Sequence, residues 1–131
     1  SNNSVHDMVY QAIKYNKINV KGDGSEIREY IYVDDAIDQA LNLIGNKKLM
    51  NKCLTITGNS LIKLVDLLGM IEEIFPNKIK IIFGKSKLAH YKYTPYKIDD
   101  MYLSKKVTLP TYTDIGEGIL SLYKYIKSIE N

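Results

Sequence analysis

Arg28 is the only arginine among the 18 lysine and arginine residues of this sequence. Its guanidinium group presents N–H donors in a fixed fork, which suits bidentate bonds to a phosphate or a carboxylate. The alternative role is a surface ion pair with Glu26 or Glu29. Arg28 is therefore a candidate for binding an anionic ligand.

Two pairs of adjacent carboxylates, Asp34 with Asp35 and Asp99 with Asp100, have the residue types of an acid and base pair. Such chemistry requires an environment that separates the two pKa values. Neighbouring side chains on a strand or at a helix start point apart, however. We therefore predict that both pairs cap helices.

Tyr93 and Lys97 have the spacing that places a lysine one helical turn from a tyrosine. A nearby ammonium group lowers the pKa of a phenol and can make it a catalytic acid or base. Pro95 lies between the two residues, removes a backbone donor and disfavours a helical Thr94. We therefore predict that this tyrosine and lysine pair is not catalytic.

The stretch from Lys85 to Pro110 contains four tyrosines and no arginine. Tyrosine rings can stack on nucleic-acid bases. Without an arginine-rich or glycine-rich pattern, we favour an irregular loop that packs on the domain, with one short helix near Asp100–Lys106. We call residues 85–110 the tyrosine-rich loop.

The composition is that of one globular domain: 131 residues, 45% hydrophobic and 25% charged. The net charge of +3 is too small to require a nucleic-acid partner. No apolar run approaches the roughly 20 residues of a membrane span. One cysteine and two histidines make a disulfide or a metal site improbable in this sequence. We expect a cytoplasmic protein with no metal, membrane or nucleic-acid partner.

Hydrophobic spacing and turn residues predict the elements that position these groups. The sequence Gly22-Asp23-Gly24 lacks the third glycine of a dinucleotide-binding turn and is followed by a strand, so we interpret it as a turn between two strands. The predicted fold class is α+β, with a small mixed sheet and about four helices. The helices are expected from Ser4 to Asn16, Ala36 to Ile44, Asn59 to Phe75 and Asp114 to the C-terminus, and the strands at Ile18–Val20, Ile27–Val33, Cys53–Thr57 and Ile79–Phe83.

One segment carries a family resemblance. Residues 20–36 read Val-Lys-Gly-Asp-Gly-Ser-Glu-Ile-Arg-Glu-Tyr-Ile-Tyr-Val-Asp-Asp-Ala. This closely resembles the pattern V-x-G-D-G-x-x-x-R-D-[FYW]-[IVL]-[YH]-V-x-D of the NAD-dependent epimerase/dehydratase family, which are extended short-chain dehydrogenase/reductases acting on nucleotide sugars. Glu29 stands where aspartate is commoner.

The resemblance continues in register along the chain. Cys53–Gly58 is similar to a strand of the family that ends in glycine, and Asn59–Phe75 resembles the helix that follows it. Residues 97–114 resemble the stretch before the last helix, whose start, Asp-x-Gly-x-Gly-Ile, appears at residues 114–119. The similarity therefore covers almost the whole chain.

The resemblance implies the C-terminal, substrate-binding part of such an enzyme. The Rossmann glycine motif, the catalytic serine or threonine and a credible tyrosine and lysine pair are not found in this sequence, which begins on Ser1 without Met. We therefore expect no catalytic residue here, and NAD or NADP bound only by a missing N-terminal Rossmann domain. Residues 34–58 and 114–131 are expected to pack on that domain, and the isolated chain is expected to form a homodimer.

The family also implies which residues bind the substrate. Arg28 is expected to reach the pyrophosphate of a nucleotide sugar, from a strand that has Arg28, Tyr30 and Tyr32 on one face and the core-facing Ile27, Ile31 and Val33 on the other. Asn19, Val20 and Lys21 match a short strand that runs beside the base and sugar.

A second basic contact of the family would fall between His90 and Lys97, where this sequence has no arginine. Lys92 or Lys97 is a possible substitute, and the tyrosines Tyr91, Tyr93 and Tyr96 are candidates for contacting the sugar.

Two other functions remain open. A non-enzymatic protein-interaction module could use the tyrosine-rich loop, and an RNA-binding domain could use the lysine-rich surface. Neither function requires the Arg28 segment, which favours the nucleotide-sugar interpretation.

Overall fold

The computed structural model describes residues 4–59, 61–85 and 104–130. These residues form four α-helices, one 3-10 helix and three two-stranded sheets, which confirms the predicted α+β class. The helices are α1 (Ser4–Tyr15), α2 (Val33–Leu43), η1 (Lys47–Leu49), α3 (Leu64–Glu73) and α4 (Ile115–Glu130). The strands are β1 (Lys17–Val20), β2 (Ile27–Glu29), β3 (Cys53–Ile56), β4 (Leu61–Lys63), β5 (Lys80–Phe83) and β6 (Ser104–Val107).

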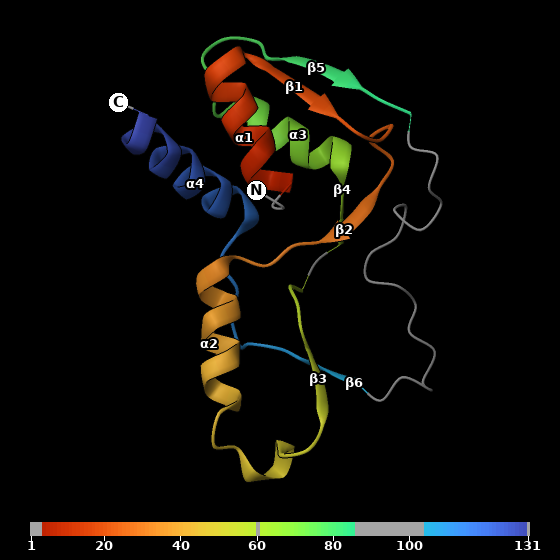
Figure 1. The fold of residues 1–131 in the computed structure, drawn as a ribbon, viewed down its shortest axis with the longest axis vertical. Coiled ribbons are helices and arrows are strands. Elements are labelled where there is room, and N and C mark those ends of the chain that lie inside the picture. Colours follow the sequence, from red (N-terminus) through yellow and green to blue (C-terminus); the bar gives the residue numbers. More distant parts are fainter. Residues whose placement is uncertain (1–3, 60, 86–103, 131) are drawn as a thin grey trace.

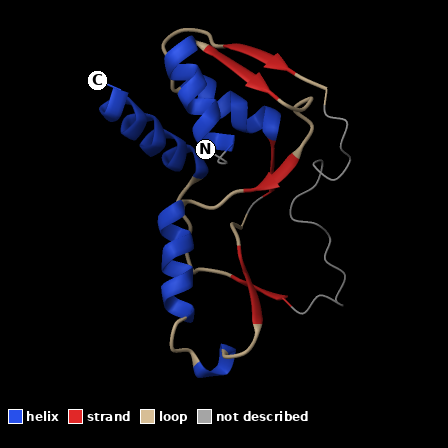
Figure 2. Ribbon diagram, in the orientation of Figure 1, coloured by secondary structure: helices blue, strands red, loops and turns tan. Residues whose placement is uncertain are grey.

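The elements gather in two lobes (Figure 1). The upper lobe contains α1, α3, α4 and the sheets β1–β5 and β2–β4. The lower lobe contains α2, η1 and the sheet β3–β6. Figure 2 shows both lobes as mixtures of helix and strand, so neither is an all-helical or all-strand unit.

The hydrophobic core lies in the upper lobe. Helix α1 buries Met8, Val9 and Ala12 toward β1 and α4, and α3 buries Leu67, Leu68 and Ile71. Ile18 of β1 and Ile126 of α4 are fully buried in the same cluster. The apolar residues recur at one-face helical spacing, so helix burial follows directly from the sequence pattern.

The described residues contain parallel and antiparallel pairing in three separate sheets rather than one continuous sheet. Strands β1 and β5 pair in parallel, with Ile18 opposite Ile81. Strands β2 and β4 pair antiparallel, with Arg28 opposite Ile62. The strands on either side of Gly22-Asp23-Gly24 therefore belong to different sheets and do not pair with each other.

The predicted helix over Asn59–Phe75 is wrong in its first part. Residues 61–63 form β4, and the helix α3 begins only at Leu64. The amide groups of Leu64 and Val65 donate to the carbonyl oxygens of Glu26 (2.8 Å) and Gly24 (3.1 Å). The turn after β1 therefore satisfies the first donors of α3.

The short helix predicted near Asp100–Lys106 is contradicted at its end, because residues 104–107 form the strand β6, parallel to β3. Asp99 and Asp100 lie outside the described residues. The starts of α1 and α4 agree with the prediction within a residue. Asp114 caps α4 by accepting from the amides of Gly116 (2.8 Å) and Glu117 (3.3 Å).

Candidate functional site

Arg28 lies in the middle of β2 and is half-buried. Its Nη1 donates to the carbonyl oxygen of the neighbouring Ile27 at 3.0 Å. Pairing with β4 fixes the backbone of β2 on one side. The guanidinium group is thus held by the main chain, and no carboxylate forms an ion pair with it among the residues that the structure describes.

Glu26 organises the turn that leads into β2. Its side chain is buried, and its Oε2 accepts from the amide of Gly24 at 2.9 Å. The carboxylate of Asp23 accepts from both the amide and the hydroxyl of Ser25. The surface ion pair that was the alternative role for Arg28 is therefore not formed by Glu26, whose carboxylate serves the turn instead.

The strand β1 carries the other predicted contacts. Asn19 is exposed, but its backbone amide and its Nδ2 both donate to Oε1 of Gln11, at 3.0 and 3.2 Å. Val20 is buried and its carbonyl accepts from Gly84 at 2.8 Å, whereas Lys21 is exposed at the strand end. A ligand that uses the amide of Asn19 must therefore replace its bond to Gln11.

Arg28 and the three residues at β1 lie in different sheets or beside them. Asn19 and Val20 belong to β1 and Lys21 follows it, while Arg28 belongs to the β2–β4 sheet, and the turn 21–26 connects them. Tyr93 and Tyr96 lie outside the described residues, as do Tyr91, Lys92 and Lys97.

The predicted alternation over residues 27–33 is wrong beyond Glu29. The strand ends there, and Tyr30, expected beside Arg28 on the ligand face, packs against the core. Burial raises the pKa of the Tyr30 phenol, while the positive charge of Arg28 lowers it. Val33, expected to face the core, is 61% exposed because it starts α2.

Two glycines allow the segment 30–32 to pass between the lobes. A Cβ on Gly58 would lie 1.8 Å from the carbonyl oxygen of Tyr30, so no side chain fits there. A Cβ on Gly118 would lie 3.1 Å from the ring of Tyr32, which rests on α4. Both glycines lie in segments that resemble the family. This resemblance was the signal in the sequence for the two close contacts.

Asp35 does not cap α2, in contrast to the prediction. The N-cap of α2 is Tyr32, which makes no side-chain capping bond. The carboxylate of Asp35 is buried and accepts from Thr113, whose amide lies 2.8 Å from Oδ2 and whose hydroxyl lies 3.0 Å from Oδ1. Asp35 therefore joins α2 to the segment that leads into α4.

Gln39 extends this connection one turn further along α2. Its side chain is fully buried, and its Nε2 donates to the hydroxyl of Tyr112 (2.9 Å) and the carbonyl of Thr57 (3.3 Å). The hydroxyl of Tyr112 also donates to Thr57 and accepts from the amide of Leu109. A polar network thus ties α2 to the ends of β3 and β6.

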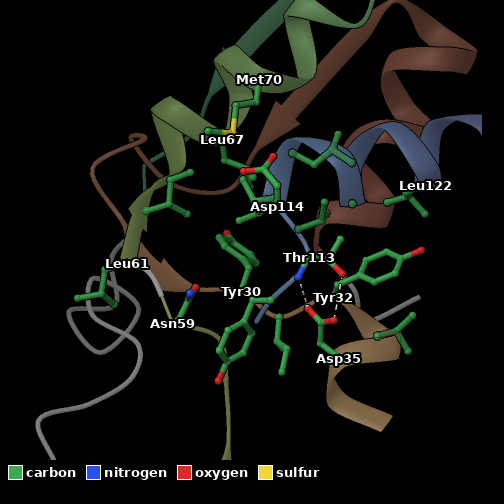
Figure 3. A pocket seen from close by; sticks show the side chains of 18 residues that line it. Tyr30, Tyr32, Asp35, Asn59, Leu61, Leu67, Met70, Thr113, Asp114 and Leu122 are labelled. Carbon is green, nitrogen blue, oxygen red and sulfur yellow. Dashed lines mark hydrogen bonds between the residues drawn. The ribbon is translucent and has the colours of Figure 1, made fainter. Parts of the chain in front are cut away.

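A cavity of about 580 Å³ opens between the two lobes. Figure 3 shows Leu67 and Met70 of α3 on one side of it and Asp35, bonded to Thr113, on the other. Tyr30, Tyr32 and the first turns of α4 line it as well, whereas Arg28 and the β1 contacts do not. Of the predicted substrate-binding residues that the structure describes, none lines this cavity.

A search with protein-family models and a search of curated protein sequences both found no match. Among solved structures, the chain resembles UDP-glucuronic acid 4-epimerase from Bacillus cereus in complex with UDP-glucuronic acid and NAD, with a TM-score of 0.76 and 21% identity over 98% of this chain. The chain has the fold of part of this epimerase.

An NAD-dependent NDP-hexosamine 5,6-dehydratase involved in tunicamycin biosynthesis is similar as well, with a TM-score of 0.75 and 16% identity over 97% of this chain. The chain spans 40% and 41% of the lengths of these two enzymes. This coverage fits the predicted C-terminal part of an epimerase/dehydratase and confirms the expected fold.

Two further findings concern the described residues only. No three histidine, cysteine, aspartate or glutamate side chains gather there in the manner of metal ligands. None of the helices formed by those residues has the length and apolar character needed to cross a membrane.

Proposed function

We propose that this chain is the nucleotide-sugar binding part of an NAD- or NADP-dependent epimerase, dehydratase or reductase. The observation that carries the proposal is the fold likeness, which extends over 98% of the chain to an epimerase bound to UDP-glucuronic acid and NAD. The Arg28 segment supports it, since a guanidinium group is the side chain best suited to bind a diphosphate.

In this proposal Arg28 binds the pyrophosphate, and the strand β1 at Asn19, Val20 and Lys21 lies beside the base and sugar. The half-buried position of Arg28 favours binding, because a partly desolvated guanidinium group interacts more strongly with an anion than an exposed one. The exposed ammonium group of Lys21 adds positive charge at the end of β1. Tyr93 and Tyr96 remain candidates for contacting the sugar.

In this proposal, the cofactor-binding part of the enzyme lies outside the described residues. Gly22-Asp23-Gly24 connects strand β1 to strand β2, whereas a dinucleotide-binding turn connects a strand to a helix. NAD or NADP, when bound by another part of the enzyme, would accept a hydride from the sugar. The residues of this chain would bind and orient the nucleotide, and none is assigned to the catalytic step.

The exposed apolar face of α2 supports the proposal that a partner packs on the lower lobe. Its buried residues, Asp35 and Gln39, are polar, while Val33, Ile37 and Leu41 of the opposite face are 61%, 50% and 59% exposed. Ile44 continues this apolar stripe at 76% exposure. We propose that residues 34–58 and 114–131 pack on the cofactor-binding part, and that the stripe pairs two copies of the isolated chain as a homodimer.

Calorimetric titration of the chain with UDP-, dTDP-, GDP- and CDP-sugars tests the binding proposal. For the preferred ligand, Arg28→Ala should weaken the binding free energy by about 1.5 to 3 kcal/mol. This corresponds to a loss of roughly 10- to 150-fold in affinity. Arg28→Lys should recover only part of this loss, because an ammonium group lacks the bidentate fork. The control Lys124→Ala removes one exposed positive charge from α4 and should leave the affinity unchanged.

Equal affinities for the native chain and Arg28→Ala would reject the role of Arg28. A chain that binds none of the four nucleotide sugars but forms stable complexes with another protein would favour the non-enzymatic interaction module.

A further inference from the structure

One edge of strand β1 pairs with no other strand among the described residues. On the side of β5, the carbonyl oxygens of Val20 (2.8 Å) and Gly22 (3.0 Å) both accept from the amide of Gly84. Backbone groups alternate between the two sides of a strand, so those of residues 19 and 21 face the opposite edge. The side chain of Gln11 reaches this free edge from α1, which lies beside β1 (Figure 1).

Two hydrogen bonds fix the orientation of the Gln11 side-chain amide. The backbone amide of Asn19 can only donate, so the Gln11 atom that faces it at 3.0 Å is the carbonyl oxygen Oε1. Asn19 Nδ2 donates to the same oxygen at 3.2 Å. Gln11 Nε2 therefore points away from these donors, and it makes no hydrogen bond within the described part of the chain.

The free edge of β1 thus carries a donor, an acceptor and a donor in order. These groups are Nε2 of Gln11, the carbonyl oxygen of Asn19 and the amide of Lys21. The imide edge of uracil or thymine has the complementary order of acceptor, N–H donor and acceptor. Cytosine has an amino donor followed by two acceptors, and it mismatches two of the three groups in either orientation.

The proposed function places the nucleotide base at this same strand. We propose that Gln11 selects the base by donating from Nε2 to a ring carbonyl oxygen, and that the ligand is a uridine or thymidine diphosphate sugar. This inference rests on the proposed function, because it requires a base beside β1. The bond between Asn19 and Gln11 remains intact, since the base uses Gln11 Nε2 in place of the Asn19 amide.

UDP-glucose and CDP-glucose form a matched pair of ligands. They share the ribose, the diphosphate and the glucose, and they differ only in the edge of the base. Titration calorimetry of the chain should give an affinity for UDP-glucose at least roughly tenfold higher, because cytosine leaves buried or facing polar groups unpaired. Equal affinities, or a preference for CDP-glucose, would overturn the inference.

Gln11→Glu replaces the free donor by an acceptor and keeps the oxygen that binds Asn19. A carboxylate accepts from the cytosine amino group and faces an acceptor oxygen of uracil, so the ratio of UDP-glucose to CDP-glucose affinity should fall roughly tenfold. The added negative charge acts on a diphosphate that both ligands share, and it cancels in this ratio. Gln11→Leu, which has neither group, should give an intermediate ratio.

Circular dichroism of both variants should remain native. An unchanged ratio in a folded Gln11→Glu would show that Gln11 only joins α1 to β1, and it would overturn the inference.

The two glutamines of the chain provide a direct readout of the contact. Gln39 is fully buried in the lower lobe, where its Nε2 donates to Tyr112 and Thr57. In the chain labelled with nitrogen-15 glutamine, UDP-glucose should shift the side-chain amide signal of Gln11 and leave that of Gln39 unchanged. This measurement uses the native chain, so it stands even if Gln11→Glu fails to fold. A Gln11 signal that stays in place at saturation would overturn the inference.

Arg28→Ala distinguishes this inference from the function on which it rests. The variant should weaken the binding of UDP-glucose and CDP-glucose by the same factor, because the proposed contact of Arg28 is the diphosphate that both share. If Arg28→Ala weakens binding while Gln11→Glu leaves the ratio unchanged, the proposed function stands and only the role of Gln11 is rejected. A chain that binds no nucleotide sugar would reject both.

Discussion

The phenol of Tyr30 is partly buried against the core of the upper lobe, and this burial raises its pKa in the folded protein. In the unfolded chain a tyrosine ionises near pH 10. The unfolded state therefore loses this proton first as the pH rises, and the stability that the neutral phenol maintains below about pH 10 is lost as the pH approaches the folded pKa.

We predict that the unfolding free energy falls more steeply above about pH 10 for the native chain than for Tyr30→Phe. Urea unfolding at about pH 8.5 and about pH 11 measures the difference. Tyr15→Phe is the matched control, since Tyr15 is 61% exposed. A pH dependence of Tyr30→Phe equal to that of the native chain would exclude Tyr30 as the cause.

Two glycines allow a comparison of backbone contact with helix propensity. Gly58 lies against the carbonyl of Tyr30, whereas a Cβ on Gly69, inside α3, meets no atom within 4 Å. Gly58→Ala should lower the unfolding free energy by about 1 to 3 kcal/mol through strain, and Gly69→Ala should raise it by about 0.5 to 1 kcal/mol. Urea unfolding of both variants tests this, and a stabilising Gly58→Ala would contradict the close approach.

At the scale of an element, α2 is attached to the molecule by its polar face. Asp35 accepts two hydrogen bonds from Thr113, while the adjacent Asp34 is exposed in the same first turn. Asp35→Ala should lower the free energy of unfolding by about 1.5 to 3 kcal/mol, whereas Asp34→Ala should change it by no more than about 0.5 kcal/mol.

Amide hydrogen exchange shows which part of the protein Asp35→Ala destabilises. Asp35→Ala should increase exchange along residues 33–43 and leave α1 and α3 protected, because the core of the upper lobe does not include α2. Equal exchange in the Asp34→Ala and Asp35→Ala variants would mean that the bonds to Thr113 do not hold the helix.

Helix α4 depends on Asp114 at its first turn. The carboxylate satisfies two amides there and its charge is favourable at a helix N-terminus. Asp114→Ala should destabilise the protein by about 1 kcal/mol and Asp114→Asn by a few tenths. Thermal unfolding followed by circular dichroism measures both, and identical losses would show that the cap contributes through charge alone.

At the scale of the whole molecule, the upper lobe contains the apolar core and the lower lobe exposes an apolar stripe on α2. We predict that the isolated chain self-associates through this stripe. Light scattering over a dilution series should show a dimer, and Ile37→Glu combined with Leu41→Glu should shift it to a monomer. Asn42→Glu adds a charge to another face of the same helix and should not.

A native chain that remains monomeric at high concentration would contradict this interface. It would also weaken the proposal that the stripe covers a cofactor-binding part, since an uncovered stripe of this size would then be tolerated in solution.

The sequence alone determined the elements whose signals are local. The apolar spacing of α1 and α4 and the four-helix α+β class follow from residues within a few positions of one another, and the structure agrees with them. The resemblance of residues 20–36 predicted the fold, because an ordered motif of this length reflects a particular arrangement of strand, turn and helix. The role of Arg28 in binding a ligand remains a prediction that a binding experiment must test.

The tertiary structure decided what depends on distant partners. Residues 61–63 have helical spacing, yet they form β4 because residues 27–29, more than thirty positions away in the sequence, supply their hydrogen-bond partners. Asp35 looks like a helix cap, but Thr113 binds its carboxylate from 78 residues away. Local patterns cannot specify such pairings, since burial and hydrogen bonding reward contacts that the chain forms only on folding. The polar attachment of α2 and the cavity between the lobes arise for the same reason.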